Sequence, residues 1–280
     1  MTRPFRLVDV FGTDPYTGNP LAVVADAEGL TTEDMQRIAG WLNFSETTFL
    51  LPPTDPAADY RVRIFTMAHE LPFAGHPTLG SAHAWLEAGG VAKADGTIVQ
   101  QCGVGLVAIR SDAGRLAFAA PPLLRSGPPS EAEIAEVAAI LRIERDAIVD
   151  AAWVDNGPGW IAVMLRSAAA VLAIEPARHH PGRVDIGVVG AHAPGGDAAF
   201  ELRAIFSDAH GGLIEDPVTG SLNASVGQWL FASGRVQGGY VAAQGTRLGR
   251  TGRIHVSQDA DGQVWVGGVT RTLVAGQGGG

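Results

Sequence analysis

The chain of 280 residues has room for one large domain or two of medium size. Its formal net charge of −9, from 20 Lys and Arg against 29 Asp and Glu, provides no basic field for a phosphate backbone, so we expect no nucleic-acid partner. Hydrophobic residues make up 46% of the chain, but no apolar run approaches the roughly 20 residues of a membrane span. We therefore expect a sizeable core, no membrane partner and a cytoplasmic location.

Two residue types occur once each and exclude several kinds of site. Cys102 is the only cysteine, which excludes an intrachain disulfide and a cysteine-based zinc cluster. Lys93 is the only lysine, and its turn-like setting does not suit the desolvated amine of a Schiff base. The sequence has no glycine-rich nucleotide fingerprint, P-loop or nucleophile elbow, and no His-Glu-x-x-His motif. We expect neither a cofactor nor a metal.

The predicted elements of the first half are mostly short strands. Apolar or alternating runs predict strands over residues 5–11, 21–24, 48–51, 60–65 and 105–109. One helix is predicted over residues 31–42, because Met35, Ile38, Ala39 and Leu42 fall on a single face.

The second half follows a polar, proline-bearing stretch over residues 121–129, which we interpret as the crossover between the halves. Ser130 and Glu133 form a capping box, so a helix is predicted over residues 130–141. The remaining runs predict strands over residues 160–165, 200–206, 254–256 and 264–266.

A diverged internal repeat relates the two halves. Ile64–His69 is echoed by Ile205–His210, and the stretch around Trp85 recurs around Trp229. Each copy reads as a strand, a loop rich in Gly and Pro, and a helix of roughly 12 residues that ends at a glycine. Chance similarity is the alternative, but Phe, His and Trp are scarce in this chain. The spacing, about half the chain length, predicts two similar halves related by a pseudo-two-fold axis.

The loops before the two repeat helices are candidates for anion binding. Residues 70–78 and 211–221 place Gly and Pro just before an apolar helix, whose first N–H groups are free to bind a carboxylate. If the halves face each other, both helix starts converge on one cleft that suits a small acid. Two ordinary helix starts are the alternative.

Several groups in or near these loops could carry proton transfer. His76, Glu215 and Asp216 are titratable, and Thr78 and Ser221 supply hydroxyls. Glu46 lies between a predicted helix and an apolar strand, where partial burial would suit a general base. On the residues alone, a solvated turn carboxylate is the simpler interpretation of Glu46.

Five motifs together resemble the PhzF family, the phenazine-biosynthesis-like branch of the diaminopimelate-epimerase fold. They are VDVFGTDPYTGNPLAVV, NFSETTF, ELPFAGHPTLGSA, EDPVTGSLNAS and QGTRLGRTGRIHV. The resemblance runs from residue 5 to about residue 275 and implies an α+β fold, with two pseudo-symmetric halves that are each a strand barrel around a central helix. We expect one half over residues 1–122, joined by a C-terminal strand from about 268–280, and the other over residues 123–267.

The resemblance also implies a function and a site. Family members with assigned activities are cofactor-independent isomerases, and many form homodimers, so a homodimer is possible here. The acid/base glutamate of the family falls on Glu46, its histidine on His76, and its aspartate and serine on Asp216 and Ser221. Substrate-binding groups are expected at four positions: Gly75, Thr78, Gly220 and Ser221.

The expected reaction is a proton shift within a small carboxylated metabolite by general acid–base catalysis. Related epimerases use two cysteines at the starts of the central helices, where this chain has approximately Ala74 and Asp216, so a two-thiol mechanism is excluded. Two other functions remain open: an amino-acid epimerase or racemase without catalytic cysteines, and a non-catalytic metabolite-binding protein of the same fold.

Overall fold

The structure of the protein is a computed structural model that describes residues 2–94, 96–112, 114–208 and 211–279. The chain divides into two compact units, Met1–Ala119 with Gly267–Gly280 (unit 1) and Ala120–Val266 (unit 2). We propose that these units are its two domains. Within the described residues, no helix has the length and apolar character needed to cross a membrane.

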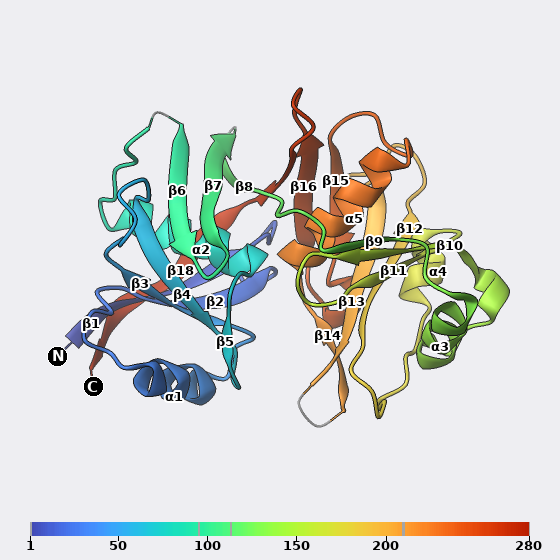
Figure 1. The fold of residues 1–280 in the computed structure, drawn as a ribbon, viewed down its shortest axis with the longest axis horizontal. Coiled ribbons are helices and arrows are strands. Elements are labelled where there is room, and N and C mark those ends of the chain that lie inside the picture. The colour runs from blue at the N-terminus through green and yellow to red at the C-terminus, as the bar shows by residue number, and fades with distance from the viewer. Residues whose placement is uncertain (1, 95, 113, 209–210, 280) are drawn as a thin grey trace. The chain divides into compact units, whose positions relative to one another are not determined.

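Unit 1 consists of strands arranged around one helix (Figure 1). Its strands are β1 (Thr2–Val10), β2 (Asn19–Val24), β3 (Thr47–Leu51), β4 (Tyr60–Phe65), β5 (Glu70–Leu71), β6 (Thr97–Cys102), β7 (Gly105–Asp112), β8 (Arg115–Ala119) and β18 (Thr270–Gly279). They pair in the order β18–β1–β2–β3–β4–β6–β7–β8, with β5 on the side of β4. The β2–β3 and β4–β6 pairs are parallel and the others antiparallel.

Helix α2 (Gly75–Glu87) is the central helix of unit 1. It contacts β1, β2, β3, β6, β8 and β18, and its first eight residues are all buried. Gly80 allows this close approach, because a Cβ atom there would lie 2.5 Å from Leu21 Cδ2. Helix α1 (Thr32–Leu42) packs against β3 and β4, and the side chain of Thr31 caps its start.

Unit 2 has the same kinds of element. Its strands are β9 (Arg125–Gly127), β10 (Ile148–Asp155), β11 (Ile161–Leu165), β12 (Asp185–Ala191), β13 (Phe200–Ser207), β14 (Leu213–Asp216), β15 (Tyr240–Gln244) and β16 (Gly252–Gln258), followed by β17 (Val264–Gly268), which runs across the boundary at residue 267. Its helices are α3 (Glu131–Leu141), α4 (Ala168–Leu172) and α5 (Gly220–Ala232), with short 3-10 turns at Arg145–Ala147 and Thr246–Leu248. The strands pair in the order β9–β10–β11–β12–β13–β15–β16, and β14 lies on the side of β13.

The pairing patterns of the two units match over seven strands, from β18 to β7 in unit 1 and from β9 to β16 in unit 2. In unit 2 the parallel pairs are β11–β12 and β13–β15, at the places that β2–β3 and β4–β6 occupy in unit 1. The short hairpins β4–β5 and β13–β14 each lead into a 13-residue helix, α2 or α5. The expected α+β fold with two similar halves is therefore confirmed, although Ala209 and His210 of the repeat lie outside the described residues.

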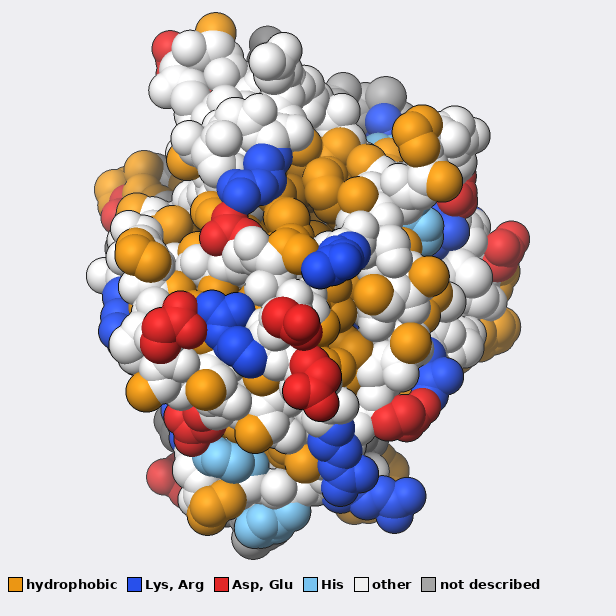
Figure 2. All heavy atoms as spheres, turned by 90° about the vertical axis from the view of Figure 1, so that its right-hand side faces the viewer, with side chains coloured by type: hydrophobic (Ala, Val, Ile, Leu, Met, Phe, Trp, Pro, Cys, Tyr) orange, Lys and Arg blue, Asp and Glu red, His pale blue; other side chains and the backbone are white. Residues whose placement is uncertain are grey.

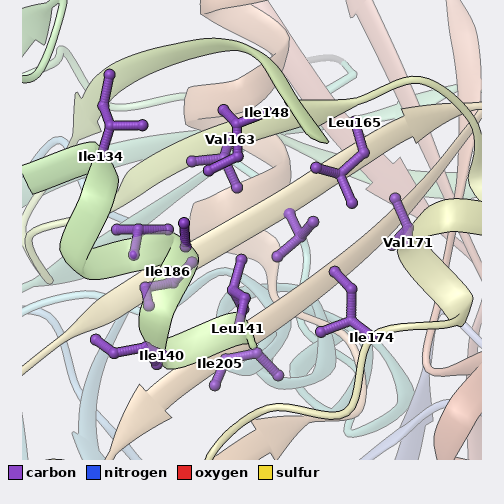
Figure 3. Close-up of a cluster of buried hydrophobic side chains, with 13 residues drawn as sticks. Ile134, Ile140, Leu141, Ile148, Val163, Leu165, Val171, Ile174, Ile186 and Ile205 are labelled. Carbon is purple, nitrogen blue, oxygen red and sulfur yellow. The ribbon is translucent and has the colours of Figure 1, made fainter. Parts of the chain in front are cut away.

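One cluster of buried hydrophobic side chains in unit 2 lies between α3, α4 and the sheet (Figure 3). Ile134 and Leu141 from α3 pack with Val163 of β11, Ile186 of β12 and Ile205 of β13. The capping box predicted for this helix is present, since the Ser130 side chain accepts from the Glu133 N–H and the Glu133 carboxylate accepts from the Ser130 N–H.

Within the polar stretch over residues 121–129, residues 125–127 form β9, which pairs with β10. Helix α4 was not predicted, because its five residues are too few for a periodic pattern. On the face seen in Figure 2, acidic and basic side chains stand beside one another without a continuous basic area.

Candidate active site

In unit 1 the structure brings together two of the predicted catalytic side chains. Glu46 lies in the connection between α1, which ends where Asn43 adopts a left-handed conformation, and the fully buried strand β3. His76 is the second residue of α2. Glu46 Oε2 lies 3.4 Å from His76 Nε2, and the two side chains are 16% and 4% exposed. The interpretation of Glu46 as a solvated turn carboxylate was therefore wrong.

Asn19 determines which ring nitrogen of His76 carries the proton. Its amide nitrogen lies 3.3 Å from His76 Nδ1, and both side chains are buried. In the amide orientation that the structure has, the NH₂ group faces Nδ1, so Nδ1 accepts this hydrogen bond and the neutral ring carries its proton on Nε2. That N–H is on the side of the ring where Glu46 lies.

The loop before Asn19 is held by a buried carboxylate. Asp9 on β1 accepts from the backbone N–H of Thr17 at 3.1 Å and of Gly18 at 2.8 Å. Only glycine fits at position 18, since a Cβ atom there would lie 2.2 Å from the Val10 carbonyl oxygen. Asp9 thus fixes the backbone from which Asn19 reaches His76.

Burial lowers the pKa of His76 to about 3, so the ring is neutral near pH 7. In the unfolded chain the same ring has its ordinary pKa of 6.5. The folded protein therefore binds fewer protons than the unfolded chain between these two values. Titration of His76 therefore does not reduce the unfolding free energy above pH 6.5, and it reduces it progressively as the pH is lowered from 6.5 towards 3.

This difference predicts how His76→Gln changes the acid sensitivity of folding. Between pH 6.5 and 4, the wild type should lose about 3 kcal/mol of unfolding free energy through His76, and the variant should not. Urea unfolding at each pH measures the difference. Equal losses in both proteins would mean that His76 is protonated in the folded state.

In unit 2 the predicted Asp216 belongs to a second cluster. It ends β14 and is 9% exposed, and its Oδ2 accepts a hydrogen bond of 2.5 Å from the Thr219 hydroxyl. Thr219 in turn contacts Gln244, a fully buried residue at the end of β15. Neither Thr219 nor Gln244 was identified from the sequence.

Ser221, the second residue of α5, receives contacts from the turn between β10 and β11. The indole N–H of Trp160 donates to Ser221 Oγ at 3.2 Å, and the Asn156 side-chain amide donates to the Ser221 carbonyl at 2.9 Å. Asp155 holds this turn by accepting from the N–H groups of Gly157 and Gly159. An indole only donates, so the Ser221 oxygen accepts and its own proton points elsewhere.

The starts of the two central helices differ from those of the other α-helices. Thr31, Ser130 and Ser167 each cap their helix with a side-chain hydrogen bond. The residues before α2 and α5, Ala74 and Thr219, make no such bond. The side chain of neither residue satisfies the first-turn N–H groups of these two helices.

The four predicted substrate-binding residues belong to these helix starts. Gly75 and Gly220 are the first residues of α2 and α5, and Ser221 follows Gly220. Thr78 is buried, donates to the Ala74 carbonyl at 2.9 Å and accepts from Gln100 of β6 at 3.0 Å. The residue before α5 that corresponds to Ala74 is Thr219, and not Asp216, which lies three residues earlier.

A pocket of about 440 Å³ lies elsewhere in unit 2. Ile143, Leu165 and Arg166 are among its lining residues, and none of the predicted site residues lines it. We do not associate it with the site.

Comparisons with known proteins agree with this picture. The model of the PhzC-PhzF family, described as phenazine biosynthesis-like protein, matches residues 8–278. Antisense-enhancing sequence 1 of Schizosaccharomyces pombe is 34% identical, over 98% of this chain and 97% of that protein. Trans-2,3-dihydro-3-hydroxyanthranilate isomerase of Pseudomonas aeruginosa is 31% identical, over 92% and 91%. A solved structure from P. aeruginosa, described as that of a predicted epimerase, is 28% identical and has a TM-score of 0.79, and the match covers 98% of each chain.

Proposed function

This chain is an isomerase of the PhzC-PhzF family, and on that premise we propose that it shifts a proton within a small carboxylated substrate, by general acid–base catalysis and without a cofactor. The observation that carries the proposal is the proximity of Glu46 to a neutral His76. Relatives named as isomerases, among them the P. aeruginosa enzyme, favour a catalyst over the non-catalytic binding protein that the sequence left open.

Glu46 is the proposed acid and base. It removes a proton from a substrate carbon and returns it to another carbon on the same face. His76 presents its Nε2–H towards Glu46, which orients the carboxylate and lets the ring exchange a proton with a substrate heteroatom. Acid–base catalysis by one group supplies roughly 10²- to 10⁴-fold of rate, so the rest comes from positioning and electrostatics.

The starts of the central helices are the proposed anion-binding groups. N–H groups of the first turn carry the positive end of the helix dipole and bind carboxylates or a developing enolate-like charge. Gly75 and Gly220 leave this backbone accessible, and neither helix start is occupied by a capping side chain. We assign Thr78 and Ser221 to substrate binding, and Asp216 to proton exchange with substrate heteroatoms.

Deuterium incorporation tests this function. The probe is trans-2,3-dihydro-3-hydroxyanthranilate, the compound in the name of the P. aeruginosa relative, together with a panel of small hydroxy- and amino acids. We expect the protein, dialysed against EDTA, to form an isomer of at least one probe in D₂O, with deuterium at carbon. Absence of exchange with every probe, or exchange that depends on an added metal or organic cofactor, would overturn the proposal.

The products also distinguish an isomerase from an amino-acid epimerase, an alternative favoured by the likeness to the P. aeruginosa structure. A single acid/base predicts partial transfer of a label from substrate carbon to product carbon. Inversion at an α-carbon with complete solvent exchange would instead indicate an epimerase with two opposed bases.

A further inference from the structure

The cluster around Asp216 contains a buried amide whose orientation the backbone determines. Gln244 Oε1 accepts from the Thr219 backbone N–H at 3.1 Å, and Gln244 Nε2 donates to the Asp216 carbonyl at 3.2 Å. A backbone N–H only donates and a carbonyl only accepts, so the amide cannot be reversed without losing both bonds. The Asn223 side chain adds a third bond of 2.8 Å to Gln244 Oε1.

This orientation determines where the Thr219 proton lies. Gln244 Nε2 also donates to Thr219 Oγ1, at 2.9 Å. The hydroxyl oxygen therefore accepts from Gln244, and the single hydroxyl proton is donated to Asp216 Oδ2, at 2.5 Å. Hydrogen bonds in a chain strengthen one another in a buried setting, and all four residues here, Asp216, Thr219, Asn223 and Gln244, have less than a tenth of their surface exposed.

Thr219, the residue before α5, does not cap this helix. A threonine before a helix normally caps it by accepting from a first-turn N–H. Thr219 makes no such bond, because its oxygen and its proton are engaged with Gln244 and Asp216. The Thr219 hydroxyl is therefore bonded to the Asp216 carboxylate and does not cap α5.

Unit 1 has the same glutamine without the carboxylate. Gln100, also fully buried, donates to Thr78 Oγ1 at 3.0 Å, and Thr78 donates to the backbone carbonyl of Ala74. Gln100 itself accepts from the Tyr60 hydroxyl at 2.8 Å. Both glutamines thus donate to a threonine hydroxyl, but the threonine in unit 1 donates to a backbone carbonyl and the one in unit 2 donates to an ionisable carboxylate.

We propose that Gln244 and Thr219 are positioning residues, which act in series to orient and stabilise the ionised carboxylate of Asp216. The inference rests on the proposed function, in which Asp216 exchanges protons with the substrate. Glu215, the charged neighbour of Asp216 in β14, is paired with Arg203 of β13 and is left unchanged in the variants that test this proposal.

The titration of Asp216, followed by NMR of carboxyl carbons in ¹³C-labelled protein and assigned with Asp216→Asn, tests the series directly. Thr219→Val keeps the shape but removes the hydroxyl, so the ionised carboxylate loses a donor and the midpoint should rise by about one to two pH units. Thr219→Ser restores the hydroxyl and should restore the wild-type midpoint. An unchanged midpoint in Thr219→Val would overturn the proposal.

Coupling between the two residues tests the order of action. Gln244→Met should raise the midpoint in the wild-type background, but it should have no further effect once Thr219 is valine. Additive effects would show that Gln244 acts independently of Thr219. Gln100→Met is the matched control in unit 1, which should alter stability without moving the Asp216 midpoint. If Gln244→Met does not fold, the midpoints of Thr219→Val and Thr219→Ser still test the proposal.

This readout needs no turnover and so separates the two proposals. A raised midpoint in Thr219→Val, together with full deuterium exchange in Asp216→Asn, would support the positioning role of Thr219 and exclude Asp216 from the reaction. An unchanged midpoint in Thr219→Val, together with lost exchange in Asp216→Asn, would overturn the positioning role and support the part of Asp216 in the reaction.

Discussion

Replacing Glu46 with glutamine is expected to lower the rate of deuterium incorporation by about 10²- to 10⁴-fold, because the variant keeps the size of the side chain and loses its basicity. Binding of the probe should be little changed, since the anion-binding groups are backbone N–H groups of the central helices. Single-turnover exchange in D₂O, with affinity measured by calorimetry, separates the two effects.

Glu28→Gln is the matched control, because Glu28 is an exposed glutamate outside the proposed machinery. It should exchange at the wild-type rate. Full activity in Glu46→Gln would remove Glu46 from the role of acid and base, whatever its distance from His76.

Arg203→Met is expected to lower the unfolding free energy by about 3–5 kcal/mol. The guanidinium makes a bidentate pair with Glu215, at 3.1 Å from Nε and 2.8 Å from Nη2, and it also donates to the carbonyls of Val171 and Ile174. The Arg203 and Glu215 side chains are 5% and 10% exposed, so the variant leaves a carboxylate buried without its partner. Urea denaturation measures the loss.

Unit 1 supplies the comparison. Arg63 pairs with Glu70 through the same two nitrogens, but the side chains are 25% and 38% exposed. Solvent screens such a pair, so Arg63→Met should cost only about 0–1 kcal/mol. A double variant, Arg203→Met with Glu215→Leu, should recover much of the loss, since it removes both charges. Equal losses in the two single variants would show that burial does not decide the cost.

Local signals in the sequence predicted local structure well. The capping box of Ser130 and Glu133 gave the start of α3, and the repeat around Trp85 and Trp229 predicted two equivalent helices. The residues of the capping box lie within one helical turn of each other, and the repeat could be detected because it contains scarce residue types. The roles of Glu46 and His76 came from the resemblance rather than from their spacing.

The supporting residues were missed because their partners are distant in sequence. Asn19 contacts a histidine 57 residues away, and Gln244 contacts a threonine 25 residues away. A glutamine within an apolar run also hides the strand: Gln100 lies on the buried side of β6, where the alternation would require an apolar residue. Extending the repeat to Gln100 and Gln244, which lie in equivalent strands, was the signal that could have found them.

The pairing of β1 with β18 has a consequence for biosynthesis. Thr2 lies opposite Gly279, so β18 can pair with β1 only after residues 120–266 have been translated, whereas unit 2 is continuous in sequence. On the ribosome, unit 2 can acquire its native contacts while unit 1 still lacks an edge partner for β1.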